Sequence, residues 1–346
     1  MSWTVKVGFS RRRLLNAVYA VVWISSLLCT STGFAEESNA VSRLEALDES
    51  SVTFKTTIFR GRNVLSNIPD KSRALVYLFH GSGGSVKFVQ RNHTQVVADA
   101  LLSKGYALVA SESKLRTGKK RWDNKSADPE TNVDIKDMLA LHEHLIANTA
   151  ITEDTPVYTM GMSNGGGFSG LFGYVASANG VPVHGIANYM GPVPFASKSL
   201  FDRGVPFPPY FVVLGEQDGL VISANVVKAV EKLTRANTST ELHLVSERAV
   251  TTEALMELGY TTPQGAGKLM EFLRKEGHID VDGNRLFHSG DVLKRKYLRE
   301  LGQEMLAAGL SRPDLNAVVI VWAGHHMRSD YVDQQVAFFE QHLTEN

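Results

Sequence analysis

Gly161-Met162-Ser163-Asn164-Gly165 is the stretch of this sequence that decides the fold. It matches G-x-S-x-G, the nucleophile elbow, in which a serine stands on a sharp turn between a strand and a helix. The glycines let neighbouring backbones pass close to the strained serine and leave its hydroxyl exposed. Because so short a motif also occurs in ordinary turns, its flanks decide the interpretation. The apolar run Thr155–Met160 predicts a buried strand before the motif, and the small residues from Gly166 to Ser177 predict a helix after it.

A second strand end lies upstream, where the apolar run Ala74–Phe79 leads into His80-Gly81-Ser82-Gly83-Gly84. This segment resembles the glycine-rich loop whose backbone N–H groups stabilise a developing oxyanion. We therefore assign the two oxyanion-hole donors to the backbone N–H groups of Ser82 and Asn164. The alternative is that the histidine and glycine only end an ordinary strand.

The predicted acid follows another buried strand, Tyr210–Leu214. Gly215-Glu216-Gln217-Asp218 comes directly after it, and a carboxylate just past a late strand can orient a catalytic histidine. Asp218 is the predicted acid and Glu216 is the second choice. Since aspartate is also a good helix cap, Asp218 could instead only begin the next helix.

The predicted base lies near the C-terminus. Ala317–Trp322 is a continuous apolar run that predicts a last strand, and Ala323-Gly324-His325-His326 follows it. His325 is the predicted base and His326 its alternative. The resulting order of serine, aspartate and histidine is the one expected for an α/β-hydrolase, unlike the orders in chymotrypsin and subtilisin.

From about Val76 to Val193 the chain resembles the esterase group that contains extracellular polyhydroxybutyrate depolymerases and feruloyl esterases. The resemblance rests on the glycine-rich loop after His80, the serine motif, Arg121-Trp122-Asp123 and Asn132-Val133-Asp134. It implies a serine carboxylesterase that needs no cofactor, with Trp122 near the substrate entrance; Trp122 and His80 are the candidate substrate contacts. Many relatives carry cysteine where Ser82 stands, and they use disulfides. Because this chain departs from that pattern, the resemblance indicates the fold more closely than it indicates the substrate.

The N-terminus predicts an export signal over residues 1–35. Lys6 and Arg11–Arg13 form a basic start, Leu14–Leu28 is mostly apolar, and a small-x-small site ends at Ala35. The double arginine fits twin-arginine export and Sec export equally well. The apolar core is too short, and too interrupted by serines, for a membrane anchor. We therefore expect a periplasmic or secreted protein.

Charge and cysteine content agree with this expectation. The 346 residues hold 36 basic and 36 acidic side chains, and cleavage after Ala35 removes four basic residues and no acidic one. A mildly acidic mature chain gives no indication of a nucleic-acid or anionic-membrane partner. The one cysteine, Cys29, leaves with the signal, so the apolar core alone must hold the fold together.

The predicted hydrolase core runs from 36 to 247 and resumes from 313 to 346 with a last strand and a helix. Between these parts, residues 248–312 form an insertion, which we interpret as a helical cap beside the site or else as a peripheral decoration. The insertion predicts short helices over Thr251–Leu258 and Pro263–Lys275, a hairpin around Asp282-Gly283, and a helix over Asp291–Ala308.

No metal site is predicted. The acidic segment after Ile279 lacks the glycine and the glutamate of a calcium loop, and His142 and His144 point in different directions on one helix. The prediction is an α/β fold with a mostly parallel sheet and helices on both faces. Its function is cofactor-free ester hydrolysis through Ser163, Asp218 and His325, on a small or oligomeric ester. A serine peptidase and a non-catalytic binding protein with the same fold are the alternatives.

Overall fold

The structure is a computed structural model. It describes residues 53–115, 120–193, 205–258, 261–286 and 293–344. The expected export signal, residues 1–35, lies outside these ranges. Within them, no helix is both long enough and apolar enough to cross a bilayer.

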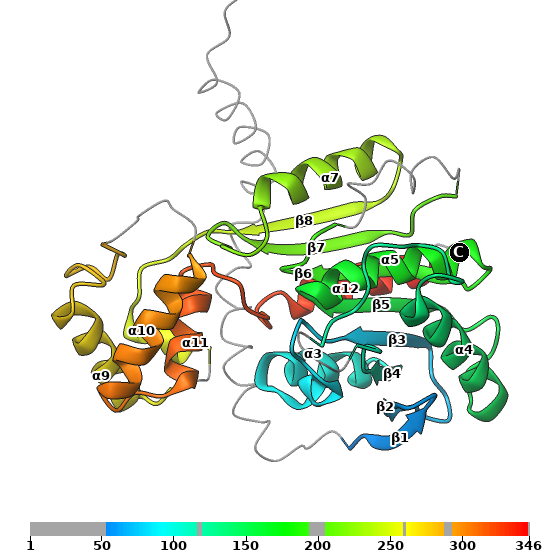
Figure 1. The fold of residues 1–346 in the computed structure, drawn as a ribbon, viewed down its shortest axis with the longest axis horizontal. Coiled ribbons are helices and arrows are strands. Elements are labelled where there is room, and N and C mark those ends of the chain that lie inside the picture. Colours follow the sequence, from blue (N-terminus) through cyan, green and yellow to red (C-terminus); the bar gives the residue numbers. More distant parts are fainter. Residues whose placement is uncertain (1–52, 116–119, 194–204, 259–260, 287–292, 345–346) are drawn as a thin grey trace, which may run out of the picture.

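Eight strands form one sheet in the spatial order β1-β2-β4-β3-β5-β6-β7-β8 (Figure 1). β2 runs antiparallel to both of its neighbours, and every other pair is parallel. A mostly parallel sheet with this order and with helices on both faces is the α/β-hydrolase fold, as predicted. The strands are β1 (Lys55–Phe59), β2 (Arg62–Asn67), β3 (Ala74–Phe79), β4 (Tyr106–Ser111), β5 (Val157–Met162), β6 (Val183–Tyr189), β7 (Tyr210–Gly215) and β8 (Thr240–Val245).

β3 shows why the central strands read as continuous apolar runs. Leu75, Tyr77 and Phe79 belong to the core on one face of the sheet, whereas the alternate residues of the strand belong to the core on the other. Successive side chains of a strand point to opposite faces, so a parallel strand covered on both sides has no polar face. Every residue of β3 is buried.

Helices cover both faces of the sheet. On one face, α4 (Val133–Asn148), α5 (Asn164–Ala178) and α7 (Ser223–Arg235) share a core with the strands. On the other face are η1 (Val86–Gln90), α3 (Asn92–Ser103) and α12 (Val332–Thr344). The first two of these are separated by one extended residue, Arg91, at φ −105° and ψ 136°.

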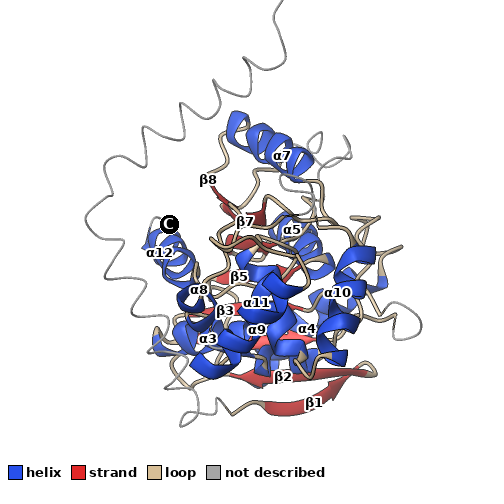
Figure 2. Ribbon diagram, turned by 90° about the vertical axis from the view of Figure 1, so that its left-hand side faces the viewer, coloured by secondary structure: helices blue, strands red, loops and turns tan. Residues whose placement is uncertain are grey.

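The insertion has a core of its own. Its helices α8 (Thr252–Met256), α9 (Pro263–Lys275) and α10 (Arg295–Ala307) share this core with α11 (Arg312–Val321), which begins at the last residue of the predicted insertion. Their apolar faces meet in a third cluster, separate from the two cores that cover the sheet. We call this unit the cap; it stands beside the sheet in Figure 1 and in front of it in Figure 2. The predicted hairpin is present in minimal form, with an antiparallel bridge between Ile279 and Arg285.

The predicted last strand over Ala317–Trp322 is wrong, because this run lies in and just after helix α11. Ser311 forms a capping box with Asp314, and Pro313 stands at the start of the helix, so the local sequence begins a helix before the apolar run is reached. A short apolar run alone fits a buried strand or a buried helix equally well. The last parallel strand is β8, and α11 packs with the cap.

Candidate active site

Ser163 occupies a nucleophile elbow between β5 and α5. Its backbone is at φ 60° and ψ −121°, a strained conformation for a residue with a side chain. Its N–H donates to the carbonyl oxygen of Tyr189, 2.8 Å away. A Cβ on Gly161 would lie 2.2 Å from Gly165 O, and one on Gly165 would lie 2.2 Å from Phe79 O. Glycine is therefore required on both sides of the serine by close backbone contacts.

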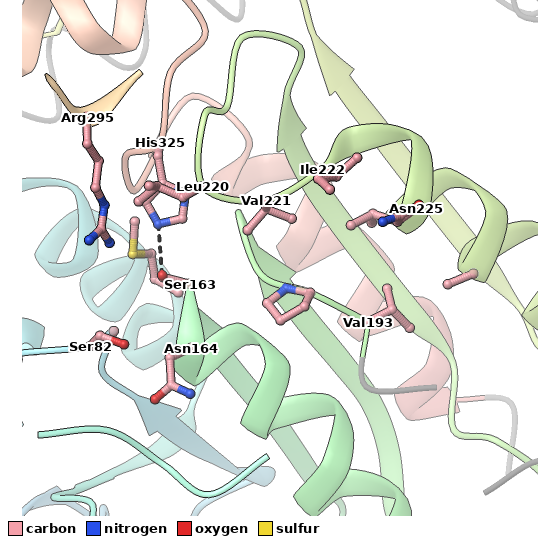
Figure 3. Close-up of a pocket in the computed structure, with 15 residues that line it drawn as sticks. Ser82, Ser163, Asn164, Val193, Leu220, Val221, Ile222, Asn225, Arg295 and His325 are labelled. Atoms are coloured by element: carbon pink, nitrogen blue, oxygen red, sulfur yellow. Dashed lines mark hydrogen bonds between the residues drawn. The ribbon is translucent and has the colours of Figure 1, made fainter. Parts of the chain in front are cut away.

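The structure brings Ser163, His325 and Asp218 together in one hydrogen-bonded chain. His325 Nε2 lies 2.8 Å from Ser163 Oγ, as drawn in Figure 3. His325 Nδ1 lies 2.7 Å from Asp218 Oδ2. Because the carboxylate can only accept, Nδ1 carries the proton and Nε2 is left to accept from the serine hydroxyl. This is the tautomer a general base needs.

Asp218 is held in place by its own loop. Its second carboxylate oxygen, Oδ1, accepts from the N–H groups of Leu220 at 2.8 Å and Val221 at 3.0 Å. The carboxylate is fully buried. Glu216, the second choice for the acid, has no hydrogen bond to His325. The arrangement therefore places Asp218 in the orienting position.

The acid loop and the histidine loop pack backbone against backbone. Gln217 N–H donates to Ala323 O at 3.2 Å, and a Cβ on Gly215 would lie only 2.0 Å from the same oxygen. The cap joins this contact, because Leu293 N–H donates to Gln217 O at 2.8 Å. The spacing between Asp218 and His325 is thus fixed by main-chain contacts.

His326, the alternative base, points elsewhere. Its Nδ1 lies 2.9 Å from the carbonyl oxygen of Met327, and its ring packs edge-on against His93 with centroids 6.0 Å apart. Burial lowers the pKa of His326. The side chain that reaches Ser163 is that of His325.

Ser82 and Asn164 are the residues predicted to supply the oxyanion hole. Both line the same cavity as Ser163, and Figure 3 shows them on the side of the serine away from His325. The side chain of Asn164 is clamped by the loop at Trp122, whose N–H donates to Oδ1 at 2.7 Å and whose carbonyl accepts from Nδ2 at 3.1 Å. Asn124 Nδ2 also donates to Asn164 O at 2.9 Å. These bonds fix the start of α5, where the Asn164 N–H lies.

Trp122 and His80 do not contact the cavity, which corrects the prediction that they bind substrate. Trp122 is 1% exposed, stacks on Phe168 at 4.5 Å and donates from Nε1 to His80 O at 3.0 Å. His80 is fully buried; its Nε2 accepts from Ser113 N–H at 3.1 Å, and Nδ1 donates to Gly81 O at 2.7 Å. Both side chains therefore support the glycine-rich loop through its backbone carbonyl groups.

Asp134 supports the same region and was marked in the sequence only by the family resemblance. Its Oδ1 accepts from Lys114 N–H at 2.7 Å, and its Oδ2 from Asp123 N–H at 2.9 Å. The buried guanidinium of Arg62 bonds to Asp134 at 2.6 Å and to Asp137 at 2.9 Å. A buried ion network therefore positions the segment that clamps Asn164.

The cavity above Ser163 measures about 620 Å³, a common size for a small-molecule site. Two parts of its lining were not predicted from the sequence. One is the apolar group from α7 and the loop before it, and the other is Arg295 of the cap. Within the described part of the chain, no group of three or more metal-ligating side chains is present. The lining residues are Gly81, Ser82, Met162, Ser163, Asn164, Pro192, Val193, Leu220, Val221, Ile222, Asn225, Val226, Ala229, Arg295 and His325.

No protein-family model matches this chain, and no curated protein matches it. Solved structures are similar in part. Esterase Pf2001 of Pyrococcus furiosus has a TM-score of 0.44 and 16% identity, covering 66% of this chain and 95% of that one. TT1662 of Thermus thermophilus has a TM-score of 0.43 and 15% identity, covering 86% of this chain and 100% of that one. XC6422 of Xanthomonas campestris, described as an α/β serine hydrolase without lid, has a TM-score of 0.40 and 16% identity, covering 65% and 94%. These values are low, so the fold described above is derived from this chain's own strand order and connections.

Proposed function

We propose that this protein is a serine hydrolase that cleaves carboxylic esters through an acyl-enzyme. The observation that carries the proposal is the hydrogen-bonded chain from Ser163 through His325 to Asp218 at the wall of a cavity of suitable size. The proposed catalytic residues are these three, and the proposed oxyanion donors are the N–H groups of Ser82 and Asn164.

In the first half of the reaction, Ser163 Oγ attacks the ester carbonyl carbon while its proton passes to His325 Nε2. Asp218 stabilises the imidazolium that forms. The carbonyl oxygen becomes an oxyanion facing the two backbone N–H groups. The intermediate collapses, the bond to the alcohol oxygen breaks, and His325 donates its proton to that oxygen.

In the second half, water replaces the alcohol. His325 removes a proton from the water as it attacks the acyl carbon, and the bond to Ser163 Oγ breaks with return of the proton to the serine. The protein's resemblance to polyhydroxybutyrate depolymerases and feruloyl esterases supports esters over other acyl compounds as substrates.

A substrate panel tests the proposal. Purified protein is assayed on short-chain aliphatic esters, hydroxyalkanoate oligomers and hydroxycinnamoyl sugars, each beside its amide analogue, with Ser163→Ala as the control. We expect turnover of at least one ester class, little or none of its amide, and none with the variant. Amide turnover exceeding ester turnover would replace the proposal with a peptidase.

We further propose that residues 1–35 direct export and are removed. The basic start, apolar core and small-x-small site support this. Mass spectrometry of protein from the periplasm or medium should find Glu36 at the N-terminus. A full-length chain retained in the cytoplasm would contradict export.

A further inference from the structure

The cavity beside Ser163 has two chemically different sides. Figure 3 shows Val221, Ile222 and Val193 on one side of Ser163 and His325, and Arg295 on the other. The apolar side is suited to a hydrocarbon chain. Arg295 is the first residue of α10, and its guanidinium extends from the cap toward the serine and His325.

Among the described residues that line this cavity, Arg295 is the one cation and there is no aspartate or glutamate. Within the described residues no carboxylate forms an ion pair with it. The carboxylate nearest to the chemistry, Asp218, is fully buried and already bonded to His325 and two N–H groups. A free guanidinium therefore faces the space that substrate must occupy.

The cationic character continues beyond the glycine-rich loop. A second hollow of about 460 Å³ shares Gly81, Ser82 and Met162 with the first. Its lining includes Arg91 and, again, no aspartate or glutamate. The described lining of both hollows thus offers a substrate an arginine and no carboxylate.

An arginine at position 295 does not stabilise helix α10. The N-terminus of a helix carries partial positive charge, so an arginine there is mildly unfavourable. The first turn of α10 also contains no acidic residue that could offset it. Arg295 is exposed and forms no ion pair within the described chain, so its guanidinium is available to a ligand.

The position of His325 decides which part of an ester meets Arg295. Nε2 must reach the leaving oxygen to protonate it, so the alcohol part of the ester departs on the histidine side. Arg295 stands next to His325 in Figure 3, whereas Val221, Ile222 and Val193 stand on the opposite side of the histidine and the serine and suit the acyl chain.

Resting on the proposed esterase activity, we propose that Arg295 binds a carboxylate on the alcohol part of the substrate. The preferred substrates are esters of an apolar acid with a hydroxy acid whose carboxylate is free. Guanidinium and carboxylate form the paired hydrogen bonds that recognise such a group.

A matched pair of substrates tests this: 4-(butyryloxy)butanoate and 4-(butyryloxy)butanamide. They share the ester bond and the chain length and differ in charge. We expect kcat/KM for the anion to exceed that for the amide by at least about tenfold, or about 1.4 kcal/mol. Arg295→Gln should remove this preference while leaving the amide within about twofold of wild type, and Arg295→Glu should reverse it. Salt at 1 M should reduce it.

The control variant is Arg299→Gln, which removes the same charge one turn further along α10 at a residue outside the cavity lining. It should keep the preference. Equal rates on both esters in the wild type, or an equal loss on both with Arg295→Gln, would overturn the inference while leaving the esterase intact. A preference for ethyl hydrogen glutarate over its amide, with none in the first pair, would move the carboxylate to the acyl side and also overturn it. Failure to cleave any ester, including p-nitrophenyl butyrate, would instead mean that the proposed function is wrong.

Discussion

At the scale of single residues, the two adjacent histidines have different surroundings. His325 bonds to Ser163 and Asp218, whereas His326 bonds to the backbone of Met327. We expect His325→Ala to lower kcat by several orders of magnitude, as removal of a triad member does. His326→Ala should cost far less activity. Steady-state kinetics of both variants check this, and the opposite ranking would place the base one residue later.

The two carboxylates of the acid loop also differ. Asp218→Asn should keep the fold but present the wrong partner to His325 Nδ1. We expect kcat to fall by about 10⁴, as it does for the corresponding change in a chymotrypsin-like protease. Glu216→Gln should leave kcat within a few-fold of wild type, because its side chain does not contact the histidine. Kinetics and circular dichroism of both variants are the measurements. A large fall in kcat for Glu216→Gln, together with an unchanged kcat for Asp218→Asn, would contradict the assignment of Asp218 as the acid.

The three residues of the hydrogen-bonded chain could be picked out because each has a local signal. The serine is flanked by glycines, and the acid and the histidine follow apolar runs. Arg295 could not be predicted, since no local pattern separates it from the neighbouring cations Lys294 and Lys296. Its place in the cavity depends on how α10 packs. Trp122 and His80 were mistaken for substrate contacts because a motif does not reveal that its aromatic rings are buried.

At the scale of elements, β3, β5 and β7 lie where apolar runs predicted them. β3 matches the predicted Ala74–Phe79, because a strand covered on both faces is apolar throughout. β8 lies at the edge of the sheet and is half-buried and partly polar, so its sequence did not predict a strand. Ala317–Trp322 is the reverse case: it is apolar throughout yet mostly helical, and five of its six residues belong to the core of the cap.

The loop that clamps Asn164 depends on the start of α4. Asp134→Asn weakens a buried network that includes Arg62 and two backbone N–H groups, so we expect a loss of about 3 kcal/mol in the free energy of unfolding. Because the clamp fixes an oxyanion donor, kcat should also fall. Urea melts and kinetics measure the two effects.

A matched control lies on the same helix. Lys136 and Glu130 form an exposed ion pair at 3.1 Å, and such pairs contribute at most about 1 kcal/mol. Lys136→Gln should therefore change stability and kcat little. If Asp134→Asn were as mild as this control, the network would not support the site.

At the scale of the whole molecule, buried histidines make the fold sensitive to acid. Burial lowers the pKa of His93 to about 3, with His326 and Arg328 acting in the same direction and Asp330 opposing. The unfolded chain binds a proton near pH 6.5 and the folded chain does not. The stability that neutral His93 contributes is therefore fully present above pH 6.5 and is lost as the pH falls from 6.5 toward 3.

For His93 alone, this loss amounts to about 2 kcal/mol between pH 7.5 and 5.0. His93→Gln, which can still accept from Ser329, should reduce the difference in unfolding free energy between the two pH values by this amount. Urea melts at both pH values measure it, with the exposed His144→Gln as control. An unchanged difference would mean that His93 is protonated in the folded protein.

The central claim joins all three scales: strand β5, the elbow and two loops from distant parts of the chain bring an activated serine to a cavity wall. Its most direct test is covalent labelling with a fluorophosphonate, read by intact mass and peptide mapping. We expect one adduct per chain, on Ser163, formed rapidly in the wild type, slowly in His325→Ala and not at all in Ser163→Ala. Absence of labelling in the folded wild type, or an adduct on another residue, would contradict the claim.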